Sequence, residues 1–299
     1  MSPLVINFNV FETDPVIAWA IPGFVVLILI ELAVRQREDF PRYDGKDAFA
    51  SIAMGIGSAV INLFMKAAAF VAFLFIYQNF RIFTFPATAW YSWVLLFFLE
   101  DFAFYMHHRS CHEIRLFWAG HVNHHSSVNY NLAVALRQGW GELTHKYIWW
   151  LWLPLLGFHP VMILMQMSVS LIYQFWLHTE TIKSLGPLEW IFNTPSHHRV
   201  HHGSNVRYLD RNHAGILIIW DRLFGTFQKE EEKVVYGITT NISTYNPLKI
   251  ASHEYAALWK DIRKAPGLMN KLKYAFMPPG WSHDGSTKTA KQLRQEVPA

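Results

Sequence analysis

The sequence contains a single cysteine, Cys111, among 299 residues. An intramolecular disulfide is therefore excluded, and so are zinc or iron–sulfur sites that need several cysteine thiolates. Any metal ion bound by this chain has to be held by histidine and carboxylate side chains.

Charged residues are also scarce. They make up 16% of the chain, whereas hydrophobic residues make up 52% and aromatic residues 16%. This composition is too apolar for an ordinary soluble domain and predicts that a lipid bilayer is the main solvent. The net charge of +4 comes from Lys and Arg scattered between apolar runs. No basic block lies beside base-stacking aromatics, so nucleic acid is not an expected partner.

The N-terminal region lacks the features of a cleaved secretory signal. Residues 1–14 carry Glu12 and Asp14 where a signal would carry Lys or Arg, and no small-residue cleavage site follows. We therefore expect the apolar run 16–32 to remain as a transmembrane helix. The charged stretch 31–46 that follows contains several Arg and Lys, which predicts that it is cytoplasmic and that the N-terminus faces outward.

Three further apolar stretches follow along the chain. Residues 48–80 are too long for one upright crossing and short for two, so they predict either one tilted helix or a tight hairpin. Residues 88–106 predict a helix that ends at the first histidines. Residues 147–177 are interrupted by two prolines and a glycine, which predicts a helical hairpin that enters and leaves by the same face. Residues 226–299 are polar and predict a cytosolic tail packed over the site.

Histidine is clustered in this sequence in a way that predicts metal binding. Residues four apart on a helix share a face, so pairs of histidines at this spacing can point at one ion. Imidazole suits Fe, Zn, Cu and Ni, and the phased histidines are too many for one ion, so two metal ions are predicted. His178 is included because it ends the apolar hairpin at the face of the site. The predicted ligands are His108, His112, His121, His124, His125, His178, His198, His201 and His202.

Iron fits this ligand set better than zinc does. Structural zinc takes four ligands and catalytic zinc takes three plus water, so these histidines exceed the needs of a two-zinc hydrolase. A pair of ferrous ions that reacts with O2 can oxidise a C–H bond that no side chain attacks by acid–base chemistry. A membrane setting for such a site predicts a lipid substrate.

For the other histidines, the sequence gives less reason to expect that they bind a metal ion. His107 and His197 would point about 100° away from better-phased neighbours on an ideal helix, so ligation and hydrogen bonding to a ligand both stay open. Isolated histidines are more often hydrogen-bonded core residues. We apply that interpretation to His145, His159, His253 and His283.

Two carboxylates are predicted to be catalytic. Asp101 lies two helical turns before His108, and Glu113 directly follows the last histidine of the first cluster. Either one can orient a ligand imidazole or handle a proton. The alternative is that the acidic residues here only neutralise Arg109 and Arg115.

With these residues in view, the chain resembles the sterol desaturase and fatty-acid hydroxylase superfamily. The mark of that superfamily is an HxxxH box followed by two HxxHH boxes, which here are His108–His112, His121–His125 and His198–His202. Within it, the chain is most similar to alkylglycerol monooxygenase-like proteins. The stretches that carry this similarity are WAGHVNHHSS (118–127), NLAVALRQ (131–138), FWLHTE (175–180), NTPSHHRVHHG (193–203) and IIWDRLFGTF (218–227).

The superfamily resemblance implies a helical membrane fold, two iron ions, O2 as co-substrate, and histidine boxes that face the cytoplasm from a bacterial inner membrane or the endoplasmic reticulum. The closer similarity implies cleavage of an ether lipid with tetrahydrobiopterin as reductant, although no pterin-binding motif is apparent in the sequence. Two positions depart from the pattern. His213 stands where the family has Tyr, and TNIS at 240–243 replaces a stretch that resembles His-Pro-Ile-Asn.

These observations predict an all-α fold: an integral-membrane helical bundle with a cytosolic helical cap that carries the two-metal site. Expected segments are transmembrane anchor helices at 1–87, a catalytic domain at 88–225 and a cytosolic tail at 226–299. A lipid hydroxylase or monooxygenase is the leading function, and a desaturase using the same site is the alternative. A zinc hydrolase and a metal-binding membrane transporter are more remote, because a transporter needs polar groups along several spans.

Overall fold

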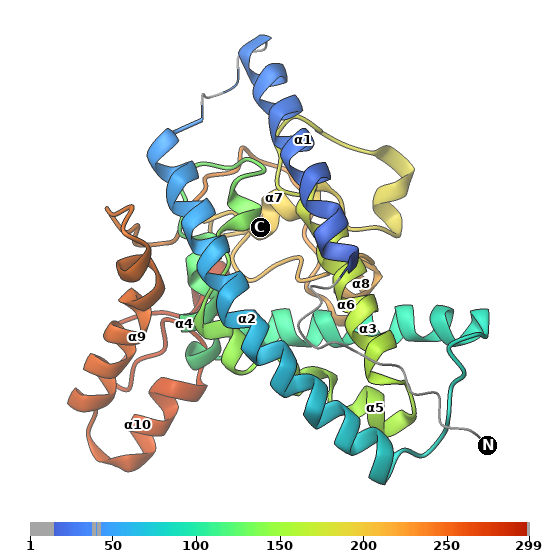
Figure 1. The fold of residues 1–299 in the computed structure, drawn as a ribbon. Coiled ribbons are helices and arrows are strands. Elements are labelled where there is room, and N and C mark those ends of the chain that lie inside the picture. Colours follow the sequence, from blue (N-terminus) through green and yellow to red (C-terminus); the bar gives the residue numbers. More distant parts are fainter. Residues whose placement is uncertain (1–14, 38–39, 41–42, 298–299) are drawn as a thin grey trace.

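The computed structural model describes residues 15–37, 40 and 43–297, with side chains from residue 20 onward. Predictions for residues 1–14, including an outward-facing N-terminus, lie outside this range. The described residues are mostly helical and form no strand; two isolated bridges pair Phe192 with Leu217 and Gly203 with Tyr236. This arrangement confirms the helical part of the predicted fold (Figure 1).

Two long helices begin the described chain. α1 spans Pro15–Arg37 and α2 spans Gly45–Phe80. α2 is continuous, so the region 48–80 is one helix and not a hairpin. Its 36 residues extend ~54 Å at ~1.5 Å per residue, more than the ~30 Å of a hydrocarbon core. By length and composition, it is the one helix in the described part of the chain suited to cross a membrane.

The surface of α2 is apolar over most of its length. Large side chains are exposed at Phe49, Ile56, Phe64, Val71 and Phe75. A continuous apolar surface of this size is unusual for a protein surrounded by water and indicates contact with lipid. The protein is therefore a membrane protein.

The middle of the chain turns back on itself. α3 (Trp90–Glu113) continues past the predicted end at residue 106 and includes the first histidine box. The fourth apolar region forms η3 (Lys146–Trp150), α5 (Trp152–Leu156) and α6 (Pro160–Phe175). Gly157, with a φ of 117°, makes the turn between α5 and α6 in a conformation that favours glycine. The broken apolar pattern therefore corresponds to a reversal of chain direction.

The main apolar core is built where α2, α3, η3, α5 and α6 meet. Its fully buried members include Phe73, Leu96, Trp150, Phe158 and Ile163. The α5–α6 turn also pairs with the link between α2 and α3, because the Phe85 N–H donates to the Gly157 carbonyl at 3.1 Å. These contacts bring α2, α3, α5 and α6 into one body.

Buried polar contacts hold the other ends of α1 and α2 near the histidines. Glu31 of α1 accepts hydrogen bonds from the Leu132 N–H at 2.8 Å and the Thr179 hydroxyl at 2.5 Å. At the start of α2, Asp47 accepts from the Ser127 hydroxyl at 2.6 Å and from Arg137 at 2.8 Å. The C-terminal end of α1 and the N-terminal end of α2 therefore lie on the same side as the histidine boxes.

Shorter helices complete the fold. α9 packs on α4 and α10 packs on both (Figure 1), so the segment predicted to be a tail covers the helix of the second histidine box. α2, which belongs to the predicted anchor segment 1–87, likewise packs on α5 and α6 of the predicted catalytic domain 88–225. The remaining elements are α4 (Arg115–His125), η1 (Val134–Leu136), η2 (Gly141–Thr144), η4 (Gly186–Trp190), α7 (Pro195–His201), α8 (Ile219–Phe224), α9 (Pro247–Lys264), α10 (Gly267–Phe276) and α11 (Ala290–Glu296).

Candidate metal centre

Four separate elements carry the predicted ligands to one place. The first box ends α3, the second ends α4, and the third occupies α7, with His202 as the C-terminal cap. His178 lies just beyond Trp176, the C-terminal cap of α6. The hairpin of the fourth apolar region therefore returns the chain to the histidines it left at His125, as the pattern predicts.

The predicted ligands converge in two buried groups. Within each group, one ring nitrogen per histidine lies within 4.8 Å of those of all the others. The two groups adjoin, since the His125 and His202 ring centroids are 4.4 Å apart. One group is His108, His112, His121, His125 and His201, and the other is His124, His178, His198 and His202.

Ring tautomers in the five-histidine group indicate a cation. His108 donates from Nδ1 to the His213 carbonyl at 2.8 Å, and His121 donates from Nδ1 to Glu142 at 2.8 Å. In neutral imidazoles, both Nε2 atoms then carry lone pairs. These two lone-pair atoms lie 3.1 Å apart, and His125 Nε2 lies 3.2 Å from that of His121. Such an arrangement is repulsive unless a positive ion lies between the rings.

The four-histidine group shows the same feature. His178 donates from Nδ1 to the Gln174 carbonyl at 3.0 Å, so its Nε2 carries a lone pair. That atom lies 3.1 Å from His124 Nε2 and 3.0 Å from His198 Nε2. The single lone pair on His178 Nε2 cannot accept good hydrogen bonds from both His124 and His198. All three imidazoles can instead coordinate one metal ion.

Several buried ring nitrogens also lack any partner within the described chain. They include the Nε2 atoms of His112, His201 and His202. Leaving a buried polar atom without a partner costs about 1–3 kcal/mol, which metal coordination would offset. The residues present therefore fit a pair of metal ions, one in each group.

Oxygen atoms outside the two groups orient the ligand rings. His201 donates from Nδ1 to the Arg211 carbonyl at 3.0 Å, and His112 points Nδ1 at Asp210 at 3.4 Å. Such partners fix the tautomer of a metal-bound histidine and raise its basicity.

Glu142 makes the shortest contact of a carboxylate with a predicted ligand among the described residues, and sequence reasoning missed it. One oxygen accepts from His121, and the other lies 3.3 Å from His107 Nε2. Burial raises the pKa of Glu142, but the hydrogen bond from His121 and the nearby Lys146 ammonium lower it more, so its pKa lies below the usual range. Glu142 follows His121 by 21 residues and belongs to no recognisable motif.

A close backbone approach makes this contact possible. A Cβ atom at Gly120 would lie 2.5 Å from the Glu142 nitrogen, and one at Gly139 would lie 1.8 Å from the Gly120 oxygen. Only glycine allows α4 and the chain before η2 to come this near. The paired glycines thus place Glu142 against the second box.

The two carboxylates predicted to be catalytic contact other groups. Asp101 accepts from the N–H groups of Ile216 and Leu217 at 2.8 and 3.0 Å, and from the Trp220 indole at 2.9 Å. Asp101 therefore fixes the loop that follows His213 by accepting hydrogen bonds from its backbone. It contacts no predicted ligand ring among the described residues. Glu113 forms an ion pair with Arg109 at 2.8 Å on the surface. This contact is the one expected if Glu113 only neutralises a neighbouring arginine.

Histidines set apart from the ligands lie outside both groups. His107 is in contact with Glu142, while His197 packs against Phe227 with ring centroids 5.4 Å apart. His159 caps α6, and His253 donates to the Ile250 carbonyl at 2.8 Å. The remaining two are also outside the converging sets: His145 and His283.

His213 is a further buried histidine beside the centre. Its ring centroid is 5.0 Å from that of His112, and neither of its ring nitrogens has a partner in the described structure. It is not a member of the converging five-histidine group. The His213 backbone does contact a predicted ligand, because its carbonyl accepts a hydrogen bond from His108 and orients that ring.

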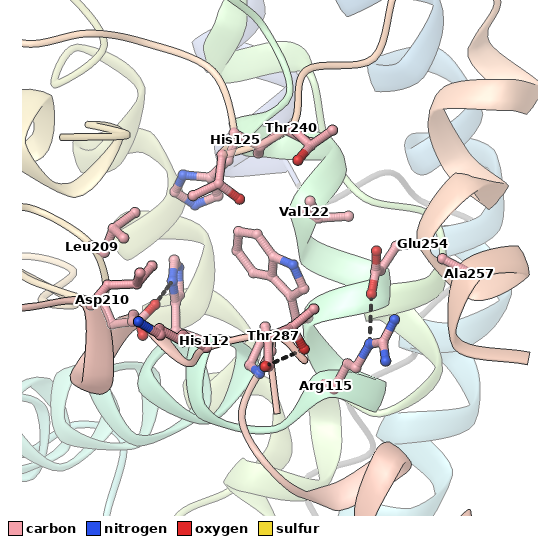
Figure 2. A pocket seen from close by; sticks show the side chains of 18 of the residues that line it. His112, Arg115, Val122, His125, Leu209, Asp210, Thr240, Glu254, Ala257 and Thr287 are labelled. Carbon is pink, nitrogen blue, oxygen red and sulfur yellow. Dashed lines mark hydrogen bonds and ion pairs between the residues drawn. The ribbon is translucent and has the colours of Figure 1, made fainter. Parts of the chain in front are cut away.

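A cavity of about 570 Å³ opens beside the five-histidine group. Figure 2 shows His112, His125, Asp210 and Thr240 around it, with the Arg115–Glu254 ion pair on the opposite wall. The centre is thus reached through a space that is large enough for a small molecule.

Comparison with known proteins shows which families this chain is similar to. Residues 93–226 match the fatty acid hydroxylase family. Alkylglycerol monooxygenase of Homo sapiens is 41% identical over 100% of this chain and 66% of its own length, and that of Xenopus tropicalis is 38% identical over 97% and 64%. An ornithine lipid hydroxylase of Rhizobium tropici is 32% identical over 43% of this chain and 39% of its own length.

The chain spans 64–66% of the length of its vertebrate relatives. No solved structure is significantly similar to it. The family match covers all three histidine boxes and His178, the residues that the structure brings together in two buried groups. Residues 93–226 of this chain therefore form a fatty acid hydroxylase domain.

Proposed function

We propose that the protein is an integral-membrane oxidoreductase that uses two iron ions and O2 to hydroxylate a C–H bond of a lipid. The observation that carries this proposal is the division of nine buried imidazoles into two converging groups. Relatives named as alkylglycerol monooxygenase and ornithine lipid hydroxylase support a lipid substrate and insertion of oxygen.

The proposed substrate is an alkylglycerol, the class named in three vertebrate relatives. Hydroxylation of the carbon beside the ether oxygen replaces a C–H bond by C–OH and gives a hemiacetal. A hemiacetal separates into an aldehyde and an alcohol, so one hydroxylation cleaves the ether. The second oxygen atom of O2 leaves as water, which takes two electrons and two protons from a reductant. We propose tetrahydrobiopterin as that reductant.

The protein's own residues hold and orient the centre. The five-histidine group would hold one ion and the four-histidine group the other; bound iron supplies the reaction with O2. Glu142, Asp210 and the carbonyls of His213 and Arg211 fix the ligand rings. Every ligand histidine is buried, which limits the access of bulk water to the ions and so protects a reactive oxidant from side reactions. Asp101 is a positioning residue, because it fixes the loop next to His213.

In the proposed membrane arrangement, α1, α2, α3 and the α5–α6 hairpin lie in the bilayer, and the histidine boxes lie on the cytosolic side beneath a helical cap. Support comes from the exposed apolar surface of α2 and from Arg35 and Arg37 at the end of α1 that is near the site. A bacterial inner membrane or the endoplasmic reticulum would provide this sidedness.

The proposal is tested with protein purified in detergent. Metal analysis should find about two iron ions per chain, because the two groups exceed one coordination sphere. Labelled alkylglycerol should yield aldehyde only when O2 and tetrahydrobiopterin are both present. Product formed without O2, or one tightly bound zinc in active protein, contradicts the proposal. An alkene product retaining the ether would instead identify a desaturase.

A further inference from the structure

The cavity beside the centre approaches the metal site from the side of the C-terminal segment. Its walls come from α4, α9 and the stretches 237–242 and 279–293, and its floor includes ligand histidines. In the part of the chain that the structure describes, no wall residue belongs to α1, α2, α5 or α6, and α3 contributes only His112 beside its C-terminal end. A molecule in this cavity therefore comes from water, not from the hydrocarbon of the bilayer.

One wall offers a flat aromatic surface next to the ligands. The Trp118 ring centroid lies 5.0 Å from that of His112 and 5.5 Å from that of His125, and all three residues line the cavity. Indole rings bind planar ligands by offset stacking, typically with centroids ~4.5–7 Å apart. A planar molecule stacked on Trp118 would lie beside two ligand rings of the five-histidine group.

Charged groups also line the cavity. Arg115 pairs with Glu254 at 2.8 Å and with Asp261 at 2.7 Å. Each carboxylate accepts several hydrogen bonds, so both can take N–H donors from a ligand in addition to Arg115. Thr240 lines the same space (Figure 2). An acyl chain would cover these charged groups and displace their water without offering a hydrogen bond, which costs free energy, whereas a nitrogen heterocycle can donate to them.

The proposed hydroxylation creates the need for such a molecule. The balanced reaction is RH + O2 + AH2 → ROH + A + H2O, in which the donor AH2 loses two electrons and two protons. The donor must come close to the ions, and four of their predicted ligands line the cavity: His112, His125, His201 and His202. Ligand cavities in proteins typically measure ~300–1,000 Å³, so about 570 Å³ suits a small heterocycle but not a protein redox partner.

We propose that this cavity is the binding site of the electron donor, and that the donor is a small, water-soluble reduced heterocycle that stacks on Trp118 and hydrogen-bonds to the Glu254 and Asp261 wall. The assignment rests on the proposed function, because hydroxylation supplies the need for two electrons. The lipid then reaches the ions by a different route, from the membrane side.

The test fills the cavity without touching a ligand histidine. Ala257 of α9 lines the cavity, whereas its neighbour Ala256 is exposed and does not, so Ala257→Trp is compared with Ala256→Trp. Equilibrium dialysis of metal-loaded protein with 7,8-dihydrobiopterin, a probe that cannot drive turnover, should show binding to wild type and Ala256→Trp. Binding to Ala257→Trp should be at least tenfold weaker, with unchanged metal content. Equal binding to all three proteins overturns the assignment.

A second measurement distinguishes loss of donor binding in the cavity from loss of the oxidation step itself. Protein reduced with dithionite and then given O2 and alkylglycerol needs no donor for one turnover, so Ala257→Trp should match wild type in this assay. With tetrahydrobiopterin as donor, the same variant should lose at least tenfold in kcat/KM, while Ala256→Trp should not. Failure of the reduced wild type to oxidise lipid contradicts the proposed function, whereas the dialysis result still decides the cavity.

If Ala257→Trp loses its metal, Thr240→Trp replaces it, because Thr240 lies on a different wall. Competition between alkylglycerol and the pterin probe in dialysis would show that the cavity takes the lipid headgroup and would overturn the assignment.

Discussion

At the scale of single residues, the ring nitrogens define which ion each histidine would hold. His178→Ala leaves three imidazoles in the four-histidine group and does not touch the five-histidine group. We expect iron to fall from about two to about one per chain and turnover to be lost, since one coordination sphere is intact and the other is not. His283→Ala is the control, because His283 bonds Tyr274 outside both groups. Two ions retained in His178→Ala would exclude this residue as a ligand.

Glu142 gives a second expectation at this scale. Glu142→Gln removes the negative charge that His121 faces at 2.8 Å, and partners of this kind typically contribute 10–100-fold to metal affinity. Iron should therefore leave the variant about 10–100-fold more readily in a chelator titration. Glu113→Gln is a matched control, because Glu113 contacts Arg109 at the surface. A larger effect from Glu113→Gln would support the catalytic role that the sequence predicts for Glu113.

At the scale of elements, the close approach of α4 to η2 determines whether Glu142 can contact the second histidine box. Gly120→Ala would place a Cβ 2.5 Å from the Glu142 nitrogen, which forces the backbone to move. We expect a lower melting temperature in detergent and weaker iron retention, because Glu142 moves away from His121. Gly45→Ala is the control, since its Cβ would meet nothing within 4 Å. Equal melting temperatures in both variants would argue against the close approach.

The third box also depends on its surroundings. α7 has seven residues, too few for a stable isolated helix. Arg199 anchors it by donating to the carbonyls of Ile182 and Lys183 at 2.6 Å each, and it pairs with Glu230. The position of three ligand histidines thus depends on contacts with segments on both sides of α7.

At the scale of the whole molecule, the proposed site requires that the chain on both sides of the α5–α6 hairpin faces the cytoplasm. Single cysteines tested in a Cys111→Ser background report this directly. Val128 and Ser184 are exposed on the two sides of the hairpin, and Thr88 is exposed at the opposite end of the helices. A membrane-impermeant reagent should label Val128→Cys and Ser184→Cys from one side and Thr88→Cys from the other.

Labelling of Val128→Cys and Ser184→Cys from opposite sides would contradict the arrangement, because ligands separated by ~30 Å of hydrocarbon cannot share a centre. Ser127 is unsuitable as a probe, since it is buried and donates to Asp47.

The amino-acid sequence alone determined the features that depend on neighbours along the chain. Composition placed the protein in a membrane, and a spacing of four residues put His108 and His112 on one helical face. The break at Gly157 and Pro160 predicted the reversal that returns His178 to the site. Each inference uses helix geometry or bilayer thickness, which do not require knowledge of the rest of the fold.

Only the tertiary structure decided which histidines share a group, and which carboxylate supports them. Asp101 and Ile216 are 115 residues apart, and Glu142 and His121 are 21 apart, so no local period reveals either contact. The continuity of α2 was likewise open, because an apolar run of that length suits a tilted helix or a hairpin until packing selects one. Such choices depend on contacts between distant segments, and these form only when the chain is folded.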